Sequence, residues 1–292
     1  MTSQACIEAF FDTATHTVSY LVSDPPSRMA VVIDPVLDYD HASGRVRTDS
    51  ADRILAAARE AGLRIAWVLE THVHADHLSA AAYLKRQTGA STGIGEHTPL
   101  VQSSFRSVFN LDDVSADGSE FDRLLADGET VAAGGLALEV MHTPGHTPAC
   151  VSYRIGNAVF VGDTLFMPDY GTARTDFPGG CARTLYRSIR RLLDLPPTTR
   201  IYLCHDYKAP DRDTYAWETT VAMQREHNIH AHEGIGEDEF VAMREARDAQ
   251  LASPALLLPS IQVNIRAGRL PAAESNHVRY LKIPLCLPDA AA

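Results

Sequence analysis

Three histidines and an aspartate lie within six residues of this chain, directly after an apolar run. The four side chains are His72, His74, Asp76 and His77, and the run is residues 65–69. Apolar runs of this length, bounded by turn residues, are typical of buried strands. Imidazole and carboxylate groups are ligands that Fe, Zn, Mn and Co accept. The cluster therefore predicts a metal site at the end of a strand, where open α/β sheets place their sites.

Three more potential ligands follow further along the chain, each again after an apolar run. They are His146 after residues 136–141, Asp163 after residues 158–161, and His205 after residues 201–203. A single H-x-H pair is a weak signal, because isolated histidines are often surface or core residues. The recurrence of ligand types at successive strand ends makes one shared metal centre the better interpretation.

The composition is that of an ordinary globular chain and excludes some partners. The chain has 292 residues, 45% of them hydrophobic, and a formal net charge of −11. A strongly acidic balance does not favour nucleic acid, and no apolar run approaches the length of a membrane span. The first six residues lack the pattern of a secretion signal, and the five cysteines are scattered without a C-x-x-C motif. We therefore expect a cytoplasmic protein with neither nucleic acid nor membrane as partner, and we leave a homodimer open.

Strands and helices are expected in two successive groups. The first has strands at residues 6–11, 18–22, 29–33, 65–69 and 91–94, and helices at residues 50–61, 79–87 and from 98 onward. The second has strands at residues 130–133, 136–141, 150–155, 158–161 and 201–203, and helices at residues 182–193, 215–227 and 237–251. Residues 38–49 and 112–120 are expected to be loops, and Val101, Phe105 and Val108 to form an apolar helix stripe. Periodicity alone predicts an α/β fold with a mixed sheet.

The H-x-H-x-D-H…H…D…H series resembles the metallo-β-lactamase superfamily. This resemblance implies an α/β fold in which two mixed sheets pack face to face with helices outside, the αββα sandwich. We expect residues 1–292 to form a single domain of this fold, with a C-terminal extension from about 250. The usual division in the superfamily puts His72, His74 and His146 on one metal and Asp76, His77 and His205 on another, with Asp163 bridging. Paired metals suit hydrolysis, because a bridging hydroxide is a nucleophile at neutral pH.

Residues 171–188 narrow the resemblance to one branch. They carry R-T-D-F at 174–177 and G-C-x-x-T-L-Y-x-S at 180–188, and they look like the persulfide dioxygenase family, a glyoxalase-II-like branch of the superfamily. The likeness extends from about residue 30 to residue 207. It implies one Fe(II) per chain, held by His72, His146 and Asp163, with positions left open for O₂ and substrate. It also implies that His74, Asp76, His77 and His205 orient ligands and water.

The resemblance implies a reaction, and two other functions compete with it. The implied reaction oxidises glutathione persulfide with O₂ and water to sulfite and glutathione, which zinc cannot support because it has no accessible redox chemistry. The first alternative is a dinuclear, glyoxalase-II-like thioesterase or another hydrolase of the same fold, since all of its ligands are present. The second alternative is a non-catalytic protein that binds metal or sulfur.

The substrate residues are less well defined than the metal ligands. The candidates are Arg174, Tyr207, Lys208 and Arg266, with Arg269 as a further cation for the carboxylates of glutathione. Arg174 has a donor fork suited to a carboxylate, and a structural salt bridge is its alternative role. Cys181 is interpreted as a structural thiol. Extra sequence at residues 98–125 and a long loop at 166–171 distinguish the chain from shorter family members and are expected to border the pocket.

Overall fold

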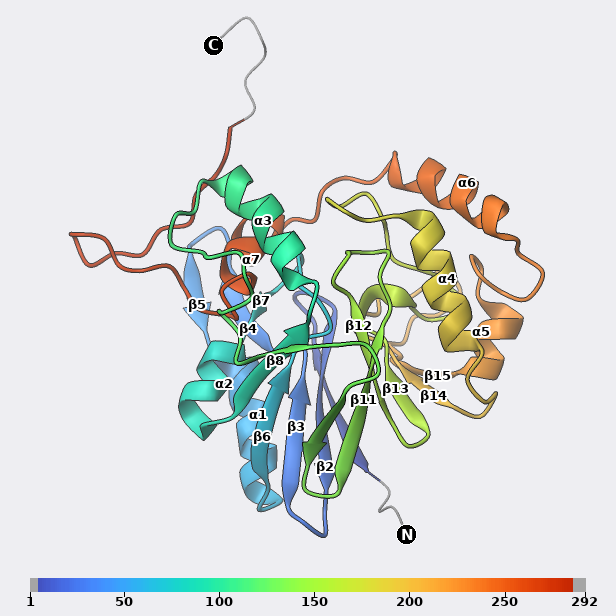
Figure 1. Cartoon of the computed structure of the whole chain (residues 1–292), viewed down its shortest axis with the longest axis horizontal. Helices are drawn as coiled ribbons and strands as arrows, with labels where there is room; N and C mark the ends of the chain where they lie inside the picture. Colours follow the sequence, from blue (N-terminus) through green and yellow to red (C-terminus); the bar gives the residue numbers. More distant parts are fainter. Residues whose placement is uncertain (1–4, 286–292) are drawn as a thin grey trace, which may run out of the picture.

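The computed structural model describes residues 5–285, and Figure 1 shows two sheets facing each other with helices on their outer sides. The first sheet has six strands in the order β1-β2-β3-β6-β8-β9. Their bounds are β1 (Cys6–Asp12), β2 (Thr17–Asp24), β3 (Met29–Ile33), β6 (Arg64–Leu69), β8 (Ser91–Gly95) and β9 (Arg123–Leu125). Strands β1, β2 and β3 are antiparallel, whereas β3, β6, β8 and β9 run parallel. The expected mixed sheet is therefore confirmed.

The second sheet also has six strands, in the order β10-β11-β12-β13-β14-β15. Their bounds are β10 (Thr130–Ala133), β11 (Leu136–His142), β12 (Val151–Ile155), β13 (Ala158–Phe160), β14 (Arg200–Tyr202) and β15 (Glu218–Thr220). Only the β13–β14 pair is parallel. A small third sheet contains β4 (Val36–Asp40), β5 (Arg45–Arg47) and β7 (Leu78–Ser79).

Helices cover the outer face of each sheet. On the outer side of the first sheet lie α1 (Asp49–Glu60) and α2 (Ala81–Thr88), whereas α3 (Thr98–Phe109) and α7 (Leu257–Asn264) lie together at the end of this sheet, against the loop after β6. On the second sheet lie α4 (Ala182–Leu193), α5 (Val221–His227) and α6 (Glu237–Asp248), and the short 3₁₀ turn η1 (Gly162–Thr164) precedes them. Among residues 5–285, no helix combines the length and apolar character needed to cross a membrane. The αββα sandwich expected from the sequence is confirmed.

Strand β2 shows how the sandwich is held together. Its side chains alternate, so that Val18, Tyr20 and Val22 face the core between the sheets while Leu21 faces the helices on the outer side. The Tyr20 ring meets the Phe160 ring of the second sheet edge to face at 5.0 Å between centroids. Because both faces of the strand are buried, its ends are fixed in position. Thr17, at the start of this strand, contacts the site described below.

Two sequence predictions of secondary structure are wrong. Residues 38–49 were expected to be a loop, but they contain most of β4 and all of β5, in which Tyr39 pairs with Val46 and both pack against the core. Short edge strands can be polar on one face, which hides them from a hydrophobicity pattern. A helix was expected over residues 215–227, but part of this range forms β15. Helix α5 starts only after Thr220, whose side chain caps the helix by accepting a hydrogen bond from the Met223 amide at 3.2 Å.

The burial pattern of the segment 98–125 and the secondary structure after residue 251 also differ from the sequence predictions. In α3 the buried stripe is Val101, Phe105 and Phe109, whereas the predicted Val108 is 51% exposed. The loop 112–120 is not wholly exposed, because Val114 and Glu120 are buried. Helix α7 was not predicted, since its buried face includes polar side chains and therefore lacks a clean apolar period. The segment ends in β9, the edge strand of the first sheet.

Candidate metal centre and cavity

The fold brings all seven predicted ligand side chains into one cluster. Four come from the loop after β6, and the remaining three follow β11, β13 and β14. The seven are His72, His74, Asp76, His77, His146, Asp163 and His205, and every one of them except Asp76 is buried. The loop after β6 belongs to the first sheet and the other three segments to the second. The cluster therefore joins the two halves of the sandwich.

Within the cluster, the ligand atoms fall into two adjacent groups. His72, His146 and Asp163 form one, in which Nε2 of His72 and Nε2 of His146 lie 3.9 and 3.7 Å from Oδ2 of Asp163. His74, Asp76, His77 and His205 form the other, and Nε2 of His205 also lies 3.3 Å from Oδ1 of Asp163. The first group matches the two-histidine, one-carboxylate set. The structure thus groups His74 with the second set, unlike the usual dinuclear division.

Each imidazole is held by one nitrogen and leaves the other free. Nδ1 of His146 lies 2.7 Å from the Arg174 carbonyl, which can only accept, so Nδ1 carries the proton. In the same way Nδ1 of His205 donates to the His16 carbonyl at 3.3 Å. Second partners of this kind fix the tautomer of metal-binding histidines and direct the other nitrogen's lone pair toward the ion.

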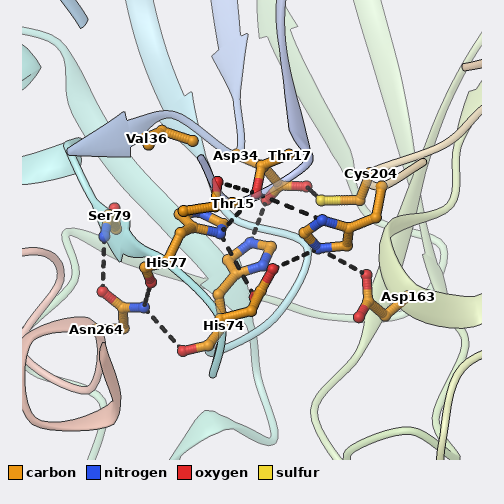
Figure 2. Close-up of polar contacts among 12 residues, drawn as sticks. Thr15, Thr17, Asp34, Val36, His74, His77, Ser79, Asp163, Cys204 and Asn264 are labelled. Carbon is orange, nitrogen blue, oxygen red and sulfur yellow. Dashed lines mark hydrogen bonds and ion pairs between the residues drawn. The ribbon is translucent and has the colours of Figure 1, made fainter. Parts of the chain in front are cut away.

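Asp34, at the end of β3, organises the loop that carries the first four ligands, and the sequence analysis did not select it. Its Oδ1 accepts from the Thr71 amide at 2.7 Å and pairs with Nε2 of His74 at 3.0 Å, as Figure 2 shows for His74. Its Oδ2 accepts from the Thr71 hydroxyl at 2.8 Å, so that hydroxyl must in turn accept from Nδ1 of His72 at 3.1 Å. A single buried carboxylate therefore sets the tautomers of two ligands.

Two further residues that the sequence analysis missed brace the cluster (Figure 2). The Thr17 hydroxyl on β2 lies 3.3 Å from Nδ1 of His77 and 3.4 Å from Nδ1 of His205. Asn264, at the end of α7, donates to the carbonyls of His74 and His77 at 2.9 and 2.8 Å and accepts from the Ser79 amide at 2.8 Å. Both are separated from the ligands by long stretches of sequence, so no local motif reveals them.

The nitrogen and oxygen atoms of the seven clustered side chains are suited to binding a metal ion. Among residues 5–285, several buried atoms that face the cluster lack a hydrogen-bond partner: Nε2 of His72, Nδ1 of His74, Oδ2 of Asp76, Nε2 of His77, Oδ1 of Asp163 and Nε2 of His205. Buried polar atoms are normally paired, and orphaned ones call for an ion or water. Imidazole nitrogens and carboxylate oxygens are the ligands of first-row transition metals. This cluster is therefore a metal-binding site.

Burial and neighbouring charges shift the pKa values of several groups in the cluster, in directions that differ from one group to the next. Burial, together with the neighbouring histidines, holds the pKa of His72 well below its usual range, so its ring is neutral. Burial opposes ionisation of Asp76, but His205 and His77 outweigh it and lower the pKa of this carboxyl. Burial raises the pKa of Glu70, which lies beside His74, to about 7. Neutral imidazole and ionised carboxylate are the forms that bind metal, so His72 and Asp76 are in the required forms, whereas Asp34 and Glu70 raise the pKa of His74 despite its burial.

A cavity of about 390 Å³ opens directly onto the metal cluster. At the cluster it is lined by Asp76, His146 and Asp163. Its walls are mainly aromatic and aliphatic, from Phe166, Tyr170, Phe177, Tyr207, Leu251 and Leu256, with guanidinium groups from Arg174, Arg244 and Arg247. This volume and lining are typical of small-molecule sites. The long loop 166–171 contributes to the wall, as expected from the sequence.

The structure brings only two of the four predicted substrate residues to the cavity. Tyr207 lines it and stacks on the ring of His205 at 5.8 Å. Arg174 also lines it, but its guanidinium donates to both carboxylate oxygens of Asp176 at 2.6 Å and to the Ala252 carbonyl at 2.7 Å. Arg174 therefore forms a structural salt bridge, which was the alternative role considered for it from the sequence.

Lys208 and Arg266 are not among the described residues that line this cavity. The Lys208 ammonium lies over the ring of Tyr215 at 4.7 Å. Arg266 is buried and pairs with Asp113 at 2.5 Å, and Arg269 pairs with Glu120. These two arginines therefore anchor the loop 112–120 to the segment after α7. A positive charge in the sequence does not show which acidic group the side chain will pair with. For this reason the sequence could not distinguish these structural arginines from substrate-binding ones.

Cys181 stands at the start of α4, outside the residues that line the cavity. Hydrogen bonds from the side chain and amide of Thr184 lower the pKa of its thiol. Within residues 5–285, four cysteines are free, and Cys150 and Cys204 among them are buried.

Comparison with known proteins agrees with this geometry. The sequence model of the Metallo-beta-lactamase superfamily matches residues 12–205. A probable metallo-hydrolase of Burkholderia pseudomallei is 57% identical over 96% of this chain and 98% of its own length. The mitochondrial persulfide dioxygenase ETHE1 of Homo sapiens is 29% identical over 90% of this chain and 88% of its own length. The crystal structure of ETHE1 from Myxococcus xanthus superimposes with a TM-score of 0.73, at 31% identity, over 90% of this chain and 100% of that one.

Proposed function

Because this chain belongs to the metallo-β-lactamase superfamily, and its metal cluster contains a separate two-histidine, one-carboxylate group, we propose that it is a persulfide dioxygenase. The reaction converts one persulfide, one O₂ and one water into one thiol, one sulfite and two protons. The terminal sulfur of the persulfide is oxidised and O₂ is reduced, so no other electron donor is needed. The proposed substrate is glutathione persulfide.

The observation that carries this proposal is the contact between the R-T-D-F segment and the metal group. The carbonyl of Arg174 fixes the tautomer of His146, and the Phe177 ring meets the imidazole of His146 edge to face at 5.2 Å. The sequence feature that resembles the dioxygenase branch therefore forms the support of a proposed iron ligand. The similarity to the crystal structure of ETHE1 from Myxococcus xanthus supports the same proposal.

His72, His146 and Asp163 are the residues proposed to hold one Fe(II) per chain. When bound there, ferrous iron supplies redox chemistry and open positions for O₂ and a persulfide sulfur. His74, Asp76, His77 and His205 line the adjoining side and offer proton acceptors and donors for water. The aromatic walls of the cavity exclude bulk water from the reacting sulfur.

A dinuclear hydrolase is the second candidate function. Its specific support is the complete second ligand group, together with the 57% identity to a probable metallo-hydrolase. Asp163 would be shared by the two metals, because its Oδ2 lies near His72 and His146 and its Oδ1 near His205. This arrangement would suit thioester hydrolysis.

Metal content distinguishes the two functions. We expect protein produced in iron-replete medium to contain one iron per chain and to consume O₂ when glutathione persulfide is added, because the triad suits Fe(II). Elemental analysis and oxygen-electrode assays of the same sample test this. Two zinc ions per chain with thioesterase activity would establish the hydrolase instead. If an iron-loaded sample were inactive on both substrates, the protein would be a non-catalytic metal- or sulfur-binding protein.

Arg174→Gln tests the support of the metal group. The variant should stay folded but lose turnover or show a raised apparent KM, because the loop whose carbonyl holds His146 loses its bonds to Asp176 and Ala252. Lysine should rescue only in part, since an ammonium cannot reproduce the donor fork. Oxygen uptake, iron content and Tm are measured together. Unchanged kinetics would remove Arg174 from the site, and lost stability with normal activity per iron would make it purely structural.

A further inference from the structure

The cavity contains three guanidinium groups, and they differ in how they are neutralised. Arg174 is paired with Asp176 at 2.6 Å. Arg244, on α6, is almost completely buried and pairs with Asp248 at 2.7 Å while donating to the Thr172 carbonyl at 3.1 Å. Both are therefore held by acceptors of the protein itself. Their donors are committed to stabilising the walls.

Arg247 is different. It lies three residues after Arg244, which places the two on neighbouring positions of one helix face, and it lines the same cavity. Within residues 5–285 its side chain has no hydrogen bond or ion pair to any protein group, and it is exposed. A cavity-lining guanidinium without a protein acceptor has its donor fork available for a ligand.

The charge of Arg247 shifts the pKa values of two nearby side chains, Tyr170 and His230. Burial raises the pKa of Tyr170, and Arg247 opposes this effect more than any other charge does. Burial also lowers the pKa of His230 to about 4, and Arg244 and Arg247 add to the decrease. Arg247 and Tyr170 also line the same cavity. The acidic groups that line the cavity, Asp76 and Asp163, belong to the metal cluster.

We propose that Arg247 binds a carboxylate of the substrate, and that the cavity thereby selects thiol derivatives that carry an anionic group away from the reacting sulfur. A planar guanidinium can hold a carboxylate through two parallel hydrogen bonds. The inference rests on the proposed function for the identity of the thiol. Arg247 thus takes the carboxylate-binding role that the sequence suggested for Lys208, Arg266 and Arg269. The side chains of those three residues make other contacts.

The test is a binding measurement that requires no turnover. Ferrous-loaded wild type and variants are titrated anaerobically, by calorimetry, with glutathione and with its diethyl ester, in which both carboxylates are blocked. Wild type should bind glutathione roughly ten- to hundredfold more tightly than the ester, as expected for a hydrogen bond between charged groups. Arg247→Gln should abolish this preference, and Arg247→Lys should keep part of it.

Arg86→Gln is the matched control, because Arg86 is an exposed arginine of α2 over the Tyr83 ring and its loss changes net charge equally. It should retain the full preference. Equal binding of both ligands by wild type, a preference that survives Arg247→Gln, or no binding of either ligand would each overturn the proposal. A wild type that discriminates between the ligands but consumes no O₂ with persulfide would reject the proposed function and keep the carboxylate site.

Discussion

Asp163→Asn is expected to lose its metal and all persulfide-dependent oxygen consumption. Asp163 is the only carboxylate in the triad, and its two oxygens face both ligand groups. Asparagine offers one neutral oxygen, so charge compensation and one potential ligand are lost together. Changes to residues that merely orient ligands cost about 10–100-fold in metal affinity, and loss of a ligand should cost more. Metal titration followed by elemental analysis measures the effect.

Asp169→Asn provides the control for this experiment. Asp169 lies in the nearby loop 166–171 and pairs with Arg212 at 2.7 Å, away from the ligand groups. Since partly exposed ion pairs contribute at most about 1 kcal/mol, this variant should keep its metal. If Asp163→Asn retained iron and normal turnover, Asp163 would not be a metal ligand, and the triad would have to be reassigned.

Asn264→Ala is expected to lower both the stability of the fold and its affinity for metal. Its amide satisfies two buried carbonyls and one buried amide of the ligand loop. Alanine would leave these groups unpaired, at about 1–3 kcal/mol for each buried group. The His74 and His77 backbone would then be free to shift, with an expected loss of about 10–100-fold in metal affinity. Thermal unfolding with and without metal measures the two effects separately.

Gln262→Ala separates the effect on the ligand loop from damage to α7 as a whole. Gln262 is as deeply buried and lies on the same helix, but its side chain binds Leu258 and Lys282 and not the ligand loop. It should lower Tm and leave metal affinity unchanged. Equal losses of metal affinity in both variants would show that α7 acts only through general stability.

The ligands could be predicted from the sequence because each is a distinctive residue directly after an apolar run. The strand ends that position His72, His146 and His205 are local features, and the superfamily resemblance supplied their convergence. The supports could not be predicted in this way. Thr17 and Asn264 are common residue types, and 188 and 187 positions separate them from the histidines that they contact. Only the packed structure brings them together.

Asp34 is an intermediate case in which a usable signal existed. It follows β3 immediately, and β3 is the parallel neighbour of β6, whose end carries the ligand cluster. Parallel neighbours end at the same edge of a sheet, so a polar residue after β3 should face the site. The cationic residues offer no such rule. Arg247 and Arg266 look alike in sequence, but in the structure Arg266 is buried against Asp113 whereas Arg247 is exposed and lines the cavity.

The division of the metal ligands between the two sheets has a consequence for how the chain reaches and keeps its folded state. Each ligand group takes residues from both halves, so we expect metal to bind the assembled sandwich more tightly than either half alone. The free energy of binding is therefore added to that of folding, by about 2.7 kcal/mol when free metal exceeds its Kd 100-fold. We therefore expect metal supply during synthesis to increase the share of chains that stay folded and escape proteolysis and aggregation, whatever the catalytic turnover.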